Sequence, residues 1–178
     1  MRWVALLRAV NVGGCKLPMA ELRELCGQLG WDNVRTFIQS GNVVFEADGD
    51  AAALEAALET AVEARFGFKR PVIVRSAAQW AAYAAGSPFA EQQEARPNYL
   101  LLGVAKAPIP PGAAEAIQAR GRAGEEVRQM TDALWLWFPD GSGVSKVTPS
   151  AIDKAAGSPV TTRNWRTVTK LQEILSEA

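Results

Sequence analysis

Three short stretches of the sequence carry residues suited to binding an anion or a polar ligand. The first is NVGGCK, residues 11–16, where Gly13 and Gly14 let backbone N–H groups approach a ligand just before a predicted helix. Its spacing matches neither the Walker phosphate-binding loop nor the dinucleotide-binding glycine loop. A plain strand-to-helix turn that needs positive φ would use the same glycines, so both interpretations stand.

The second stretch is FIQSGNVVF, residues 37–45, in which a polar group separates two apolar runs. Ser40-Gly41-Asn42 is typical of a tight hairpin, and the turn alone indicates no function. Turn chemistry does not explain Gln39 or Arg8, which are polar residues at the ends of apolar strands. With Asn11 they could bind a polar or phosphorylated ligand through neutral hydrogen bonds and one guanidinium.

The third stretch is TTRNWRTVTK, residues 161–170. Thr162 or Asn164 is predicted to cap the last helix. Arg163 and Lys170 place positive charge near the start of that helix, which is unfavourable unless an anion or a carboxylate compensates it. Lys146, which precedes another capped helix, could join this basic cluster.

Other catalytic and metal-binding chemistry is restricted by composition. The chain has no histidine, which excludes a histidine-based triad and imidazole metal sites. Cys15 and Cys26 form no CxxC motif, so neither a disulfide framework nor a structural zinc site is predicted. No cofactor is predicted either. The pairs Glu21/Glu24 and Glu125/Glu126 are expected on exposed faces, so no acid–base pair is predicted. Whether the protein is an enzyme stays open, with lysine or cysteine as the remaining common nucleophiles.

The overall charge and the apolar runs restrict partners and location. Nineteen basic and nineteen acidic residues cancel, which argues against a basic nucleic-acid-binding protein. No apolar run approaches the length of a membrane span. The run at residues 4–7, between Arg2 and Arg8, is too short for a secretory signal. We therefore expect a cytoplasmic protein.

The elements predicted over residues 1–76 would bring several of these side chains together. Strands at 2–12, 34–39, 43–47 and 71–75, with helices at 18–30 and 51–66, give the order β-α-β-β-α-β of a ferredoxin-like subdomain. In this fold the end of the first strand, the hairpin and the loop before the fourth strand meet at one edge of the sheet, called the rim below. Arg8 and Asn11 should therefore lie near Gln39, with Lys69 and Arg70 close by. On the long helix, Glu55, Glu59 and Glu63 are expected to point outward.

Residues 77–178 predict a second, smaller α+β subdomain packed on the first. Strands are expected at 98–105 and 133–138, and Thr148-Pro149 should open a short helix that stops at Gly157. No internal repeat is apparent. Trp135 and Trp137 alternate along a strand, and we expect them to form a buried wall between the subdomains rather than a base-stacking surface.

Four motifs together resemble those of one family. LLRAVNVGG (6–14), MAELRELCGQLG (19–30), FIQSGNVVF (37–45) and TTRNWRTVTKL (161–171) are similar to the bacterial family called Domain of Unknown Function 1697. The resemblance implies two α+β subdomains, the first ferredoxin-like, and supplies no activity. The chain departs from the family pattern at Ala9, where the pattern has Gly, at Arg166, where it has Asn, and at Pro149, where it tends to have Asn.

The leading hypothesis is binding of a small anionic or nucleotide-like ligand at the rim, facing a helix start from the second subdomain. The alternatives are an RNA-binding module, which would use the ferredoxin-like sheet, and a structural or protein-interaction role. The predicted ligand-binding residues are Arg8, Asn11, Gly13, Gly14, Gln39, Ser40 and Asn42 on the rim, and Lys146, Thr162, Arg163, Asn164 and Lys170 in the second subdomain.

Overall fold

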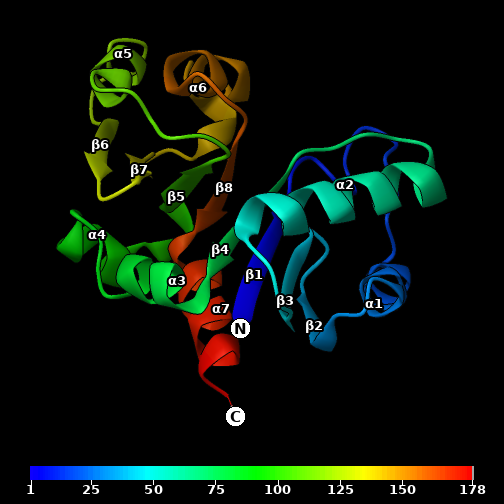
Figure 1. Ribbon diagram of the computed structural model, residues 1–178. Helices are drawn as coiled ribbons and strands as arrows, with labels where there is room; N and C mark the ends of the chain where they lie inside the picture. Colours follow the sequence, from blue (N-terminus) through cyan, green and yellow to red (C-terminus); the bar gives the residue numbers. More distant parts are fainter. Residues whose placement is uncertain (178) are drawn as a thin grey trace. The chain divides into compact units, whose positions relative to one another are not determined.

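A computed structural model describes residues 1–177, and the chain forms two compact units (Figure 1). The N-terminal unit consists of Met1–Ala82 together with the residues from Leu171 onward. The C-terminal unit is Tyr83–Lys170. Each contains a four-stranded antiparallel sheet, so the α+β class expected from the sequence is confirmed.

The N-terminal unit has the predicted ferredoxin-like topology, with strand order β2-β3-β1-β4. Each neighbouring pair of strands is antiparallel, so β3 lies between β1 and β2 as expected. Its elements are β1 (Arg2–Leu7), α1 (Met19–Gln28), β2 (Asp32–Phe37), β3 (Asn42–Glu46), α2 (Ala51–Phe66), β4 (Val72–Ser76) and the beginning of α3 (Ala77–Ala84).

The core of this unit forms where α1 and α2 cover one face of the sheet (Figure 1). Trp3, Ala5 and Leu7 alternate along β1 toward that face, because successive side chains of a strand point to opposite sides. Helix α2 has the predicted bounds because its ends are capped. Asp50 accepts a hydrogen bond from the Ala53 N–H at 2.8 Å, and Gly67 ends the helix in the left-handed conformation.

Helix α2 also covers the edge strand β4. The carboxylates of Glu55 and Glu59 accept hydrogen bonds from the backbone N–H groups of Val74 and Val72, both at 2.9 Å. The expectation that these glutamates point outward is wrong for Glu55, which is 7% exposed. An uncovered edge strand presents unpaired donors to other chains, and here the two carboxylates occupy them.

The C-terminal unit repeats the same topology, with strand order β6-β7-β5-β8. The sequence predicted neither this repeat nor the two edge strands, because both edge strands are short and mostly polar. Its elements are α4 (Ala90–Ala95), the 3-10 helix η1 (Pro97–Tyr99), β5 (Leu100–Ala105), α5 (Ala113–Gln118), β6 (Glu126–Met130), β7 (Ala133–Trp137), the 3-10 helix η2 (Ser142–Val144), α6 (Pro149–Ala156), β8 (Val160–Asn164) and the first half of α7 (Trp165–Ser176).

The repeat extends to the strand register. Strands β1 and β4 form five residue pairs, from Trp3↔Ser76 to Leu7↔Val72, and β5 and β8 form five from Leu101↔Asn164 to Ala105↔Val160. In both units a helix begins at the residue after the last of these strands, α3 after β4 and α7 after β8. The units therefore share one β-α-β-β-α-β-α plan without an apparent sequence period.

The first strand is shorter than predicted. Strand β1 ends at Leu7, and the chain then leaves the sheet through Ala9 and Asn11, which both have positive φ. Thr148 caps α6 and Gly157 ends it, as predicted. Within residues 1–177, no helix has both the length and the apolar character needed to cross a membrane.

Candidate functional site

The rim of the N-terminal unit is held together by Asn11. Its Oδ1 accepts from the Leu17 N–H at 2.8 Å, and its Nδ2 donates to the carbonyls of Leu17 at 3.0 Å and Gln39 at 2.6 Å. The predicted proximity of Asn11 to Gln39 is thus confirmed. The amide side chain closes the loop at 11–17 and fastens it to the hairpin.

The hairpin residues also have structural partners. Asn42 is fully buried and donates to the Phe37 carbonyl at 2.9 Å and to the Ser40 hydroxyl at 3.0 Å. A Cβ at Gly41 would lie 2.7 Å from Val10 Cγ2 and 2.9 Å from Leu7 Cβ, and φ there is +81°. Only glycine fits this close approach, so packing adds a second requirement for glycine to the turn preference.

The remaining rim residues include two half-buried arginines, Arg8 and Arg70. Arg70 donates to the Ala9 carbonyl at 3.3 Å and to Cys15 Sγ at 2.8 Å, so its predicted place at the rim is confirmed. The backbone N–H of Arg8 donates to the Pro71 carbonyl at 3.0 Å. Gly13, Gly14 and the side chain of Gln39 are exposed.

The two cysteines differ in their reactivity. Burial raises the pKa of the Cys26 thiol to about 12, so it stays protonated at neutral pH. Cys15 is partly exposed. Of the two thiols, only Cys15 is therefore accessible to a reagent.

The C-terminal unit contains a pocket of about 410 Å³ on the helix-covered side of its sheet. Such a volume is typical of small-molecule sites, which combine an apolar lining with a few polar groups. We call it the hydroxyl pocket. It is lined by Leu101, Phe138, Val147, Pro149, Ile152 and Val160, by the hydroxyl residues Ser142, Ser145, Thr148 and Thr162, and by Gly143.

A buried carboxylate fixes one wall of the hydroxyl pocket. The Ser145 hydroxyl donates to Glu125 Oε2 at 2.9 Å and accepts from the Val147 N–H at 3.0 Å. Glu125 also accepts from the Arg122 N–H at 2.8 Å and is 5% exposed. The expectation that Glu125 lies on an exposed face is wrong. The hydrogen bonds from Arg122 and Ser145 hold its carboxylate in a buried position.

Strand β8 separates the polar residues that the sequence grouped at 162–164. Thr162 lines the hydroxyl pocket, and the strand alternation turns Arg163 to the opposite face. Arg163 is 8% exposed and donates from Nη1 to the Thr161 hydroxyl and the Thr162 carbonyl, both at 2.8 Å. Burial lowers its pKa to about 10, so it is still charged at neutral pH.

The cap of α7 is Asn164, whose Oδ1 accepts from the Thr167 N–H at 3.0 Å. Thr162 was the other predicted cap, and it lies within β8 instead. Lys146 is exposed and stands between two residues of the hydroxyl pocket, Ser145 and Val147. Lys170 is an exposed residue of α7. Of these predicted residues, Thr162 lines the hydroxyl pocket, whereas Lys146 is next to two lining residues in the sequence and is not itself part of the lining.

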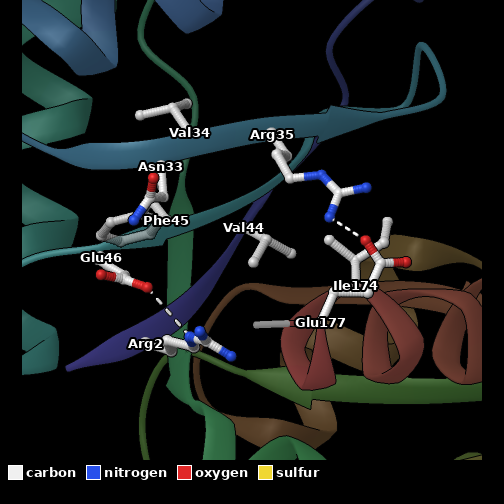
Figure 2. Close-up of a pocket in the computed structure, with 9 residues that line it drawn as sticks. All are labelled: Arg2, Asn33, Val34, Arg35, Val44, Phe45, Glu46, Ile174 and Glu177. Carbon is white, nitrogen blue, oxygen red and sulfur yellow. Dashed lines mark hydrogen bonds and ion pairs between the residues drawn. The ribbon is translucent and has the colours of Figure 1, made fainter.

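A second pocket, of about 280 Å³, lies in the N-terminal unit (Figure 2). We call it the charged pocket. None of its residues was predicted, because its four charged members come from four separate parts of the chain, β1, β2, β3 and the residue after α7, with no motif among them. It is lined by Arg2, Asn33, Val34, Arg35, Val44, Phe45, Glu46, Ile174 and Glu177.

The tryptophans of β7 bear on the RNA-binding alternative. Trp135 and Trp137 are 1% and 9% exposed. Stacking on bases requires an accessible aromatic face, and these two rings are buried. The expected burial of the two side chains is thus confirmed.

Comparison with known proteins reveals one family and one fold. A family model described as "Protein of unknown function (DUF1697)" matches residues 1–135. The solved structure of the conserved bacterial protein SP0830 from Streptococcus pneumoniae is similar, with 22% sequence identity and a TM-score of 0.72 over 98% of each chain. Likeness at this identity shows the shared fold. No curated protein matches the chain.

Proposed function

Because the chain belongs to this family of proteins of unknown function, we propose its function from its own chemistry: it binds a small nucleotide-like ligand in the hydroxyl pocket. The observation that carries the proposal is the lining, which combines six apolar residues with four hydroxyl residues, among them Thr162 and Ser142. An aromatic or heterocyclic ring would pack on the apolar residues, and hydroxyls can donate to or accept from its polar edge.

Lys146 supports an anionic group on the ligand. Its side chain is exposed beside Ser145 and Val147, which line the pocket. A lysine ammonium binds phosphate as a compact point charge. The ring would therefore lie in the pocket and the phosphate at its mouth.

The other predicted ligand-binding residues support the fold more directly. Asn11, Asn42 and Asn164 are engaged in the loop, the hairpin and the cap of α7. Arg163 lies on the opposite face of the sheet from Thr162. These contacts favour a structural role for the four residues.

Isothermal titration calorimetry with the four ribonucleoside 5′-monophosphates and their nucleosides tests the proposal. Thr162→Val keeps the side-chain shape and removes one hydroxyl, so we expect binding of both forms to weaken by about 3- to 10-fold. Thr169→Val is the control, because Thr169 bonds to its own helix on α7.

Lys146 is tested by the difference between the two ligand forms. Lys146→Gln should weaken the monophosphate and leave the nucleoside unchanged. Lys154→Gln, an exposed lysine of α6, is the matched control. The absence of saturable binding by every compound, or equal binding by Thr162→Val and the unaltered protein, would contradict the proposal.

A further inference from the structure

The charged pocket has two ion pairs on either side of an apolar floor (Figure 2). Arg2 Nε lies 3.0 Å from Glu46 Oε1, and Arg35 pairs with Glu177. Val44 lies between the two pairs in the figure and is 6% exposed. A ligand on this floor would therefore meet both signs of charge.

The charges of the pocket select for a dipolar ligand. Two arginines and two glutamates line it, so their formal charges sum to zero. A simple anion or cation would be attracted by one partner of each pair and repelled by the other. A zwitterion can turn its carboxylate to a guanidinium and its ammonium to a carboxylate. We propose that the charged pocket binds a free α-amino acid.

The two ion pairs have different roles in this site. Arg2 also donates from Nη1 to the Leu175 carbonyl at 3.0 Å. Hydrogen bonds from Arg2 and Asn33 lower the pKa of Glu46, which keeps it ionised at neutral pH. Arg2 and Glu46 thus form a fixed wall of the pocket.

The other pair, Arg35 and Glu177, meets the ligand. Both side chains are 50% exposed, and an ion pair at that exposure contributes little to stability. Exchanging it for a ligand therefore costs little. Arg35 receives the ligand carboxylate, which matches the guanidinium fork, and Glu177 receives the ammonium.

The ligand would join two elements of the N-terminal unit. Ile174 and Glu177 belong to α7 and the residue after it, whereas Arg35 and Val44 belong to the sheet. The amino-acid side chain would pack on Val44 and Ile174. Binding should therefore hold the last turn of α7 against the sheet.

Calorimetric titration of the full chain with each of the standard L-amino acids tests the inference. For the tightest amino acid we expect the N-acetyl and the carboxamide derivatives to bind at least about tenfold more weakly, because each loses one charge-assisted contact. Hydrogen exchange of the amides at 171–177 should slow when the amino acid is bound.

Two variants assign the ends of the ligand. Arg35→Gln should remove the preference for the acid over its carboxamide, and Glu177→Gln the preference for the amine over its N-acetyl form. Arg23→Gln is the control, since exposed Arg23 on α1 donates to the Thr36 hydroxyl outside the pocket. A purely structural ion pair would lower stability in both pocket variants and produce neither change in ligand preference.

Two results would overturn the inference. One is that no amino acid gives saturable binding up to about 10 mM, the range of the weakest specific affinities. The other is that Arg35→Gln binds the amino acid as tightly as the unaltered protein. Neither result bears on the hydroxyl pocket, which is lined by residues of the C-terminal unit alone.

Discussion

At the scale of single residues, the backbone conformation at Ala9 explains why the family pattern has glycine at this position. Ala9 has φ +53°, in the left-handed region that favours glycine. The family pattern has glycine at this position, and alanine here bears a steric cost. That cost is local, because the side chain of Ala9 is exposed.

Replacing Ala9 with glycine should therefore stabilise the protein. We expect Ala9→Gly to raise the free energy of unfolding by about 0.5–1 kcal/mol, the relief of the left-handed conformation less the extra chain entropy of glycine. Urea denaturation measures it. Ala56→Gly, at an exposed position inside α2, should instead lower the free energy by about 1 kcal/mol. Equal losses in both variants would contradict this account.

The contacts of single residues were predictable where turn preferences or the strand order determine them. A turn at Ser40-Gly41 follows from turn preferences, although Asn42 already belongs to β3, and the contact of Asn11 with Gln39 follows from the strand order. Glu125 was mispredicted because its partners, the Arg122 N–H and the Ser145 hydroxyl, come from a turn and from a distant loop. An acidic pair has the same sequence whether or not one member finds such partners.

At the scale of elements, the end of β8 and the start of α7 show how one polar residue can serve the fold. Asn164 is the last residue of β8 and also the cap of α7. The two elements follow without a loop, and the Asn164 side chain accepts from one N–H group of the first turn of the helix.

Removing that cap should cost stability without affecting the hydroxyl pocket. Asn164→Ala should lower the free energy of unfolding by about 1 kcal/mol, and Asn164→Ser, which keeps an acceptor, by less. Thermal and urea unfolding measure the change. Calorimetry with the nucleoside monophosphates should show unaltered binding, and a loss of binding with unaltered stability would assign Asn164 to the site instead.

Elements were predictable in proportion to their apolar pattern. Helix α2 has the predicted bounds because its buried leucines recur at helical spacing between an aspartate and a glycine. Strand β6 was missed because it is an edge strand whose last three residues, Arg128 to Met130, are exposed. Such a strand is defined by its pairing with β7, which the local sequence does not record.

At the scale of the whole molecule, the chain contains the same topology twice. The match of register between β1/β4 and β5/β8 was not predictable, because the equivalent residues differ in type. Asn42 in β3 pairs with Leu6, whereas Ala133 in β7 pairs with Val104 at the corresponding place. A topology of this kind needs only apolar residues at alternating positions.

The two units should differ in their independence. The C-terminal unit is one uninterrupted segment with its own buried core, so a fragment of residues 83–170 should fold and unfold cooperatively. A fragment of residues 1–82 lacks Leu175 and Glu177, which contact Arg2 and Arg35, and should be less stable. Circular dichroism during heating distinguishes the two. A disordered 83–170 fragment would contradict the prediction.

The return of the chain to its first sheet also affects the order in which the protein is made. The ribosome releases the N-terminal residues first, yet the contacts of Arg2 with Leu175 and of Arg35 with Glu177 must wait for the stretch after Leu171. All strands of the segment 83–170 have already been synthesised when that stretch emerges. The N-terminal unit is therefore the first to begin synthesis and the last to complete its fold.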